Sequence, residues 1–252
     1  MAIKGRLTVD KYQGSMPVTS EAAQKPPYYY RNMDMMFFLY KTDPEAALEW
    51  LPDALELDEP ALITIIFAYY GWSTFGPYHE VMMSIRARLD GEVVSYYPAL
   101  FTDQEAPLIG GREIWGFAKK LANIEIKHQS EVMMGTIERP SGNRLMTGTM
   151  RNVTPVAPED FQLTPSVSLR MIPSASGEGR PALAELIGSS LALKPHIGAN
   201  GIPHIWTGPG SVHYDVPSEI DPWYKMPVLE TVGCYSGIFD AELSPGKVLK
   251  TL

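Results

Sequence analysis

The stretch that decides the interpretation of this chain reads GREIWGFAKKL and covers residues 111–121. Two lysines, Lys119 and Lys120, stand side by side in a segment that is otherwise rich in aromatic and aliphatic residues. If the segment runs as a strand, its side chains alternate between two faces. The face of Lys119 then carries Glu113, Trp115, Phe117 and Leu121. This pattern predicts one ammonium group in apolar surroundings, with a second beside it on the backbone.

A buried lysine beside another cation is a candidate nucleophile. A free lysine amine titrates near about 10.4, so only about one molecule in 2,500 is neutral at pH 7. Burial and a neighbouring positive charge both disfavour the charged form of Lys119. A neutral amine can attack a ketone, and the protonated imine then accepts electrons from a breaking carbon–carbon bond. The alternative is that both lysines extend to solvent from the edge of a strand.

Further segments recur with this stretch in a fixed order. They are Tyr40–Asp43, Leu57–Pro60, Gly76–Glu80, Leu169–Pro173, Glu185–Ile187 and Trp206–Pro209. Together with GRE followed after five residues by the lysine pair, they resemble the acetoacetate decarboxylase family over roughly residues 26–243. The resemblance implies that Lys119 is the Schiff-base lysine and Lys120 its neighbour. Lysine activation in that family is an established example of nucleophilic catalysis.

The resemblance also assigns expectations to other residues. Glu80, within Gly76–Glu80, matches a glutamate near the catalytic lysine, where it would orient the substrate or move protons. Tyr78, Glu113, Trp115 and Phe117 are candidate substrate contacts, although a structural role for Glu113 is about equally expected. The iminium is itself the electron sink, so no added cofactor is expected. The family further implies a small keto acid substrate and self-association into a homo-oligomer.

Three positions depart from the family pattern. The arginine of the first core strand is replaced by Met33, a second glutamate by Ile65, and the proline before the lysine pair by Ala118. These exchanges make the expected pocket more apolar and weaken the case for acetoacetate itself. Arg31, two positions before Met33, would share its strand face and could replace the missing cation.

The bulk composition excludes several classes of protein. A net charge of −8 argues against a nucleic-acid partner, which needs clustered lysine and arginine. The single cysteine, Cys234, cannot form an internal disulfide. His196, His204 and His213 fit no standard metal motif, so no metal is expected. Without a signal peptide or a long apolar run, the chain is expected to be cytoplasmic, with no membrane partner.

Turn residues and strand patterns predict the fold class. The 22 prolines and 21 glycines are spread through the 252 residues, with β-branched and aromatic runs between them. We expect a mainly β (α+β) fold with an antiparallel barrel-like or double-sheet core and a few short helices. Residues 1–27 are predicted to form an extended arm, and residues 28–252 a single domain. The aromatic run Tyr28–Tyr30 is expected to serve the core or an interface.

Three functions are compatible with these observations. The first is a cofactor-independent lysine-imine lyase that decarboxylates a 3-oxo acid, either acetoacetate or a larger and more apolar analogue. The second is an aldolase-dehydratase that condenses pyruvate with an aldehyde through the same imine, which the loss of the arginine and glutamate would suit. The third is a non-catalytic barrel that binds an apolar ligand.

Overall fold

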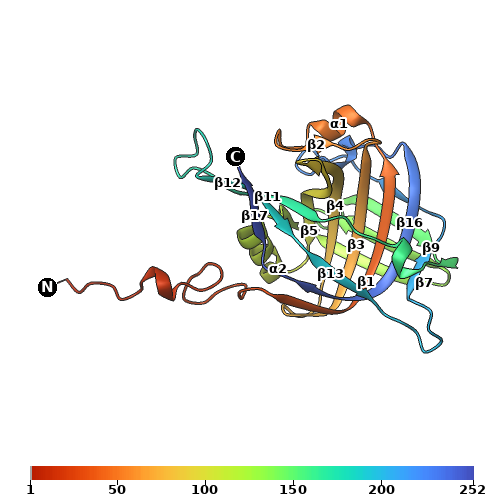
Figure 1. Ribbon diagram of the computed structural model, residues 1–252, viewed down its shortest axis with the longest axis horizontal. Helices are drawn as coiled ribbons and strands as arrows, with labels where there is room; N and C mark the ends of the chain where they lie inside the picture. Colours follow the sequence, from red (N-terminus) through yellow and green to blue (C-terminus); the bar gives the residue numbers. More distant parts are fainter. Residues whose placement is uncertain (1) are drawn as a thin grey trace.

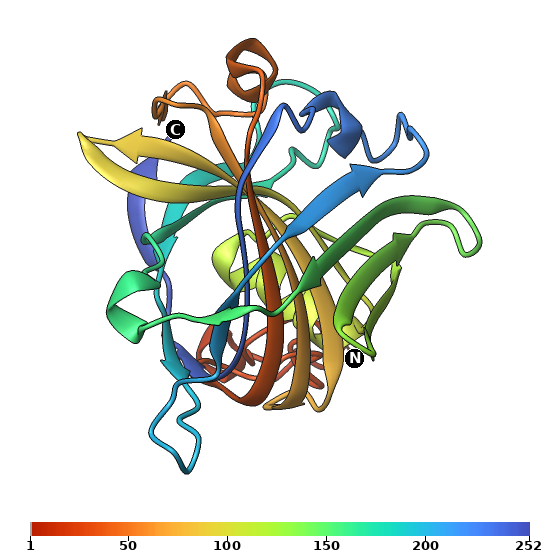
Figure 2. The ribbon, with the colours of Figure 1, turned by 90° about the vertical axis from the view of Figure 1, so that its right-hand side faces the viewer.

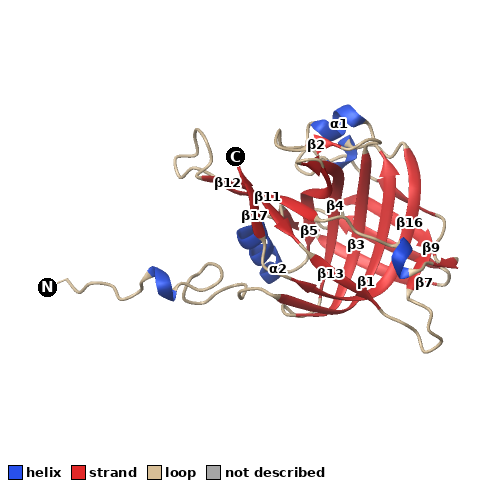
Figure 3. Ribbon diagram, in the orientation of Figure 1, coloured by secondary structure: helices blue, strands red, loops and turns tan. Residues whose placement is uncertain are grey.

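The computed structural model describes residues 2–252 and shows a mainly β protein with few helices (Figures 1 and 3). The strands of the larger sheet are β1 (Tyr28–Lys41), β2 (Glu56–Leu57), β3 (Leu62–Ser73), β4 (Tyr78–Leu89), β5 (Glu92–Thr102), β6 (Lys119–Leu121), β10 (Thr154–Pro155), β11 (Ser166–Ile172), β12 (Leu183–Ser189), β13 (Leu191–Pro195), β14 (Ile205–Thr207), β16 (Glu230–Leu243) and β17 (Lys247–Thr251). The smaller sheet comprises β7 (Asn123–Gln129), β8 (Val132–Glu138), β9 (Arg144–Arg151) and β15 (Gly210–Tyr214). The helices are α1 (Pro44–Leu48), α2 (Glu105–Gly110), a π-helix (Gly111–Trp115) and 3₁₀ turns at Val9–Lys11, Pro158–Asp160 and Trp223–Lys225.

The larger sheet is strongly curved. Its main strand order is β10-β14-β16-β1-β3-β4-β5-β11-β12-β17, with β13 paired to β16, β2 to β4 and β6 to β5. All of its pairs are antiparallel except β5–β6 and β5–β11. Because this order has two ends, the sheet is barrel-like without being closed, and it curves around α2 in Figure 2. The predicted fold class is therefore confirmed.

The central strands bury both of their faces. On one face, Phe38 of β1, Phe67 of β3 and Met83 of β4 pack with residues of the smaller sheet in one apolar core. On the other face, Tyr30 of β1 and Tyr70 of β3 belong to a second core inside the curve. Since successive side chains of a strand point to opposite faces, these strands are apolar along almost their whole length. The two faces thus separate the structural core from the interior where the site lies.

Local sequence signals account for helix α1 and for the hairpin that joins β4 to β5. The Asp43 side chain accepts a hydrogen bond from the Glu45 backbone N–H, and Pro44 occupies the first turn of α1. Asp90 and Gly91 both have positive φ and turn β4 into β5, as expected for an Asp-Gly hairpin.

The prediction of one strand over residues 111–121 is wrong. The segment begins as the π-helix, turns at Gly116, whose φ of 79° is left-handed, and is a strand only over β6. The Cβ of any other residue at position 116 would lie 2.3 Å from the Cα of Arg170. Glycine is therefore needed both for the backbone angle and for this close approach.

The N-terminal segment has two structurally different parts. In Figure 1 the first part of the chain projects away from the sheets. From Ser15 onward the chain folds back, because the Ser15 hydroxyl donates to the Ala23 carbonyl and accepts from the Ala23 N–H, both at 2.8 Å. Ser15 and Ala23 are both buried. The division into an arm (1–27) and one domain (28–252) stays a prediction.

Within residues 2–252, no helix combines the length and apolar character needed to cross a membrane. The same residues contain no group of three or more histidine, cysteine, aspartate or glutamate side chains placed to hold a metal ion.

Two facing glycines set the distance between the sheets. Gly135 of β8 pairs with Gly148 of β9, and a Cβ at Gly135 would lie 2.4 Å from the ring of Phe67. Gly135→Ala should therefore force the sheets apart and destabilise the protein by about 1–3 kcal/mol. Urea unfolding measures this change, and adding Phe67→Leu should recover part of the loss. An unchanged unfolding midpoint for Gly135→Ala would contradict this account of the packing.

Candidate active site

A buried ion pair lies at the centre of the second core. The Lys119 ammonium and Glu80 Oε1 are 2.8 Å apart, and the two side chains are only 6% and 5% exposed. Strand pairing brings the two residues together, since Lys119 of β6 lies beside Leu100 of β5, and Glu80 of β4 lies beside Thr102 of the same strand. Two charges removed from water depend on each other, because separating them would leave each one unpaired.

A tyrosine hydroxyl contacts the Glu80 carboxylate. Tyr70 donates a hydrogen bond to Glu80 Oε2 at 2.9 Å, and its ring stacks on Tyr78 with centroids 4.3 Å apart. Burial, and then the negative charge of Glu80, raise the pKa of Tyr70 well above its ordinary value. The same two effects raise the pKa of Tyr30. These phenols consequently stay protonated, and Tyr70 holds Glu80 in place while Lys119 occupies the other oxygen.

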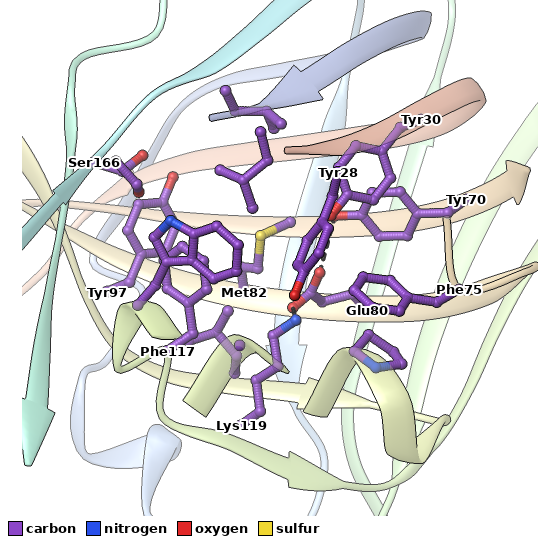
Figure 4. A pocket seen from close by; sticks show the side chains of 17 residues that line it. Tyr28, Tyr30, Tyr70, Phe75, Glu80, Met82, Tyr97, Phe117, Lys119 and Ser166 are labelled. Atoms are coloured by element: carbon purple, nitrogen blue, oxygen red, sulfur yellow. Dashed lines mark hydrogen bonds and ion pairs between the residues drawn. The ribbon is translucent and has the colours of Figure 1, made fainter. Parts of the chain in front are cut away.

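The pair opens onto a cavity of about 60 Å³ with mainly apolar walls (Figure 4). A space of this size admits a few water molecules or a small organic acid. The aromatic part of the wall comprises Tyr28, Tyr30, Tyr70, Phe75, Tyr97, Trp115 and Phe117. The aliphatic part includes Met82, Leu100, Leu191 and Leu243, and Ser166 and Ser189 add hydroxyl groups. Among the described residues that line the cavity, Lys119 is the cation and Glu80 the anion.

The turn before β6 makes room for the lysine side chain. Gly111 begins the π-helix directly over it, and a Cβ at this position would lie 2.8 Å from Lys119 Cε and 3.0 Å from Cδ. The Arg112 guanidinium donates to the Lys119 carbonyl at 3.0 Å and fixes the backbone at that point. The GRE motif thus contributes space and backbone anchoring to the site.

Lys120 points away from the cavity. Its ammonium lies 2.7 Å from Asp221 Oδ1 and donates to the Ile220 carbonyl, and 43% of its side chain is exposed. Arg139 contacts the other oxygen of the same buried aspartate at 3.0 Å. Neighbouring residues of a strand point to opposite faces. Lys119 therefore points to the interior and Lys120 to the outside of the protein.

The predicted placement of Arg31 beside Met33 is wrong. An extra residue of β1 bulges against β16 between Tyr30 and Met33, and Asn32 there has a φ of 52°. The bulge breaks the alternation of faces, so Tyr30 and Met33 are both buried while Arg31 faces outward near Asp240. Met33 lies in the inner core behind the residues that line the cavity.

Ile65 and Glu113 are also not brought to the cavity. Ala68 and Tyr70 of β3 point to the interior that contains the cavity. Ile65 lies on the opposite face of this strand and belongs to the core against the smaller sheet. Glu113 is exposed and accepts a hydrogen bond from the Met16 N–H at 3.0 Å. Its predicted position on the Lys119 face is wrong because that prediction needed a continuous strand.

The structure brings Trp115, Phe117 and Tyr78 close to the lysine. Trp115 and Phe117 line the cavity, and their rings are stacked with centroids 6.1 Å apart. The Lys119 ammonium lies 5.8 Å from the Phe117 ring centroid and 6.0 Å from that of Tyr78. These rings keep the amine in apolar surroundings.

Sequence reasoning missed several cavity residues, among them Tyr70, Tyr97 and Ser166. Tyr28 and Tyr30, expected in the core or an interface, are core residues that also form the wall. Strand alternation could have identified Tyr70. Ala68 of β3 pairs with Glu80 of β4, and Tyr70 points to the same face of β3 as Ala68. Ser166 arrives through the parallel pairing of β11 with β5, which no local pattern indicates.

Comparison with known proteins identifies the family of this chain. The family described as acetoacetate decarboxylase matches residues 15–252. Acetoacetate decarboxylase of Paraburkholderia xenovorans is 33% identical over 240 residues, which cover 93% of this chain and 91% of the relative. The crystal structure of acetoacetate decarboxylase from Legionella pneumophila has a TM-score of 0.84 and 27% identity, and the alignment covers 100% of this chain and 99% of that one.

A more distant structure has the same fold. It is the enduracididine biosynthesis enzyme MppR complexed with the condensation product of pyruvate and imidazole 4-carboxaldehyde, with a TM-score of 0.81 and 18% identity. The alignment covers 96% of this chain and 98% of that chain. The chain belongs to the acetoacetate decarboxylase family and is a carbon–carbon lyase.

Filling the space over the lysine tests the site. In Gly111→Ala the new methyl group would displace Lys119 Cε, while the helical backbone accepts alanine without strain. We expect kcat/KM for acetoacetate to fall by about tenfold or more, as for a misplaced catalytic group, with little change in thermal stability. Gly5→Ala is the control, since nothing lies within 4 Å of a Cβ there. Full activity in a folded Gly111→Ala protein would contradict the assigned position of Lys119.

Replacing Lys120 tests whether the second lysine takes part in the reaction or only pairs with Asp221. In Lys120→Met the charge of Asp221 remains paired with Arg139, and we expect kcat/KM to stay within about threefold of wild type, because the partly exposed Lys120 ammonium points away from the cavity and is screened by solvent. The matched variant Lys119→Met should be inactive. Comparable losses of activity in both variants would show that Lys120 acts on the reaction directly.

Proposed function

We propose that this protein decarboxylates a 3-oxo acid through an imine on Lys119. The observation that supports the proposal is the ion pair of Lys119 with Glu80, buried at the wall of a small and mainly apolar cavity. An amine must lose its proton before it attacks a ketone. Glu80 is the nearest base, at 2.8 Å from the ammonium, so the proton has a short path to the carboxylate.

The imine forms through successive proton transfers. First, Lys119 gives a proton to Glu80, its free electron pair attacks the ketone carbon of the substrate, and a second proton moves from the nitrogen to the former ketone oxygen, which gives the carbinolamine. The proton on Glu80 then passes to the carbinolamine hydroxyl, which leaves as water while the nitrogen electron pair forms the double bond of the iminium. Tyr70 donates to the second oxygen of Glu80 throughout, so the carboxyl group keeps its orientation while it exchanges the proton.

The carbon–carbon bond breaks from the iminium. The bond between the carboxyl carbon and its neighbour cleaves, carbon dioxide leaves, and the electron pair moves through the new double bond to neutralise the nitrogen. The neighbouring carbon then takes a proton, and water releases a ketone from Lys119. Loss of a carboxylate charge is favoured where the walls are apolar, as they are around this cavity.

The proposal also includes the substrate class, the absence of an added cofactor, the oligomeric state and the cellular location. The reaction as written needs a small keto acid and no added cofactor. Self-association into a homo-oligomer is supported by exposed apolar side chains in the N-terminal segment, such as Ile3 and Val9. A cytoplasmic location stays a prediction from the sequence.

Borohydride trapping tests the proposal. The protein is incubated with acetoacetate, and separately with pyruvate, and sodium borohydride is added before intact and peptide masses are measured. We expect an acetone-sized adduct on Lys119 after acetoacetate, because decarboxylation precedes reduction, and none in Lys119→Met. An adduct with pyruvate alone would favour the aldolase-dehydratase alternative. No adduct with either acid would favour an apolar-ligand-binding barrel and contradict the proposal.

A further inference from the structure

A second hollow adjoins the catalytic cavity. It is an open groove of about 350 Å³, and its walls include Phe161, Leu193, Pro195 and Phe239. Leu191 lines both the groove and the cavity. The catalytic cavity itself is about 60 Å³, so a substrate longer than a small acid cannot be enclosed there. The groove is the adjoining space in which such a substrate would continue.

Strand β13 forms an apolar track between the two spaces. Leu191, Leu193 and Pro195 are partly buried, whereas Ala192 and Lys194 between them are exposed. This alternation turns the three apolar side chains toward the interior. At about 3.3 Å per residue, the track extends about 13 Å from the catalytic cavity. A chain of methylene groups that passed Leu191 would therefore meet apolar side chains along its length.

The part of the groove wall next to β13 is aromatic, and its rings stack on one another. Phe161 lies against Phe239 with ring centroids 5.6 Å apart and an interplanar angle of 24°. It also meets Phe37 of β1 edge-on at 5.0 Å. Phe239 and Phe37 are buried in the inner core, so this wall is fixed to the large sheet. The side chains that line the groove are apolar except for Gln162, and apolar side chains favour an unbranched hydrocarbon chain over a polar substituent.

From this arrangement we infer that the preferred substrate is a 3-oxo acid with an apolar chain of several carbons on the ketone side, and that Leu191 and Leu193 determine its length. The inference rests on the proposed imine chemistry and names the substrate class for it. The ketone and the carboxylate occupy the catalytic cavity beside Lys119, and the chain passes Leu191 into the groove.

Chain length provides the test. The value of kcat/KM is measured for acetoacetate, 3-oxohexanoate and 3-oxooctanoate. Each methylene transferred from water to the groove should raise kcat/KM by about fourfold, which corresponds to about 0.8 kcal/mol. We therefore expect at least tenfold between acetoacetate and 3-oxohexanoate, and a further increase for 3-oxooctanoate.

Two variants locate the effect in the groove. Leu193→Trp fills the space beyond Leu191 and should lower the ratio of kcat/KM for 3-oxooctanoate to that for acetoacetate by about tenfold or more. Lys194→Trp adds the same side chain to the exposed side of β13 and should leave this ratio unchanged. Leu193→Asp, which places a charge in the groove, should act like Leu193→Trp, and circular dichroism checks that each variant is folded.

The outcomes separate this inference from the proposed function. If acetoacetate forms the Lys119 adduct but longer acids are poorer substrates, the imine chemistry stands and the inference is overturned. An unchanged ratio in folded Leu193→Trp and Leu193→Asp also overturns it. If none of the three acids can be trapped on Lys119, both the inference and the proposed function fail.

Discussion

The interior of this protein depends on one ion pair, that of Lys119 with Glu80. Both side chains are buried, so neither charge has water to stabilise it, and each is tolerated because the other lies 2.8 Å away. In the proposed mechanism, one proton moved from nitrogen to oxygen removes both charges and frees the amine to act as the nucleophile.

The fold keeps this pair separate from the structural core. Strands β1, β3 and β4 present one face to the smaller sheet and the other to the cavity, so the protein packs tightly on one side and leaves space on the other. A glycine is needed both between the two sheets and beside the cavity. Gly135 lets the sheets approach, whereas Gly111 gives Lys119 its place under the π-helix. Neither position could be interpreted from hydrophobic periodicity, because what matters there is the absence of a side chain.

Much of the fold follows from local sequence signals. The Asp-Gly hairpin, the cap at Asp43 and the long first strand are determined by neighbouring residues, and the mainly β fold class follows from them. The site was harder to derive. The burial of Lys119 was expected from a continuous strand, yet it arises from a π-helix and a left-handed glycine that return the chain to the edge of β5. One bulged residue placed Arg31 outside, and strand parity placed Ile65 on the other face. Such effects depend on tertiary packing and on single-residue shifts of register.

The central claim, that turnover passes through an imine of Lys119, is tested most directly by the fate of the ketone oxygen. Forming the imine releases that oxygen as water, and hydrolysis introduces a new one from the solvent. The measurement is mass spectrometry of the acetone produced from acetoacetate in ¹⁸O-labelled water, quenched before free acetone exchanges. We predict that every newly formed acetone molecule carries the label. Acetone formed at the full enzymatic rate without the label would contradict it.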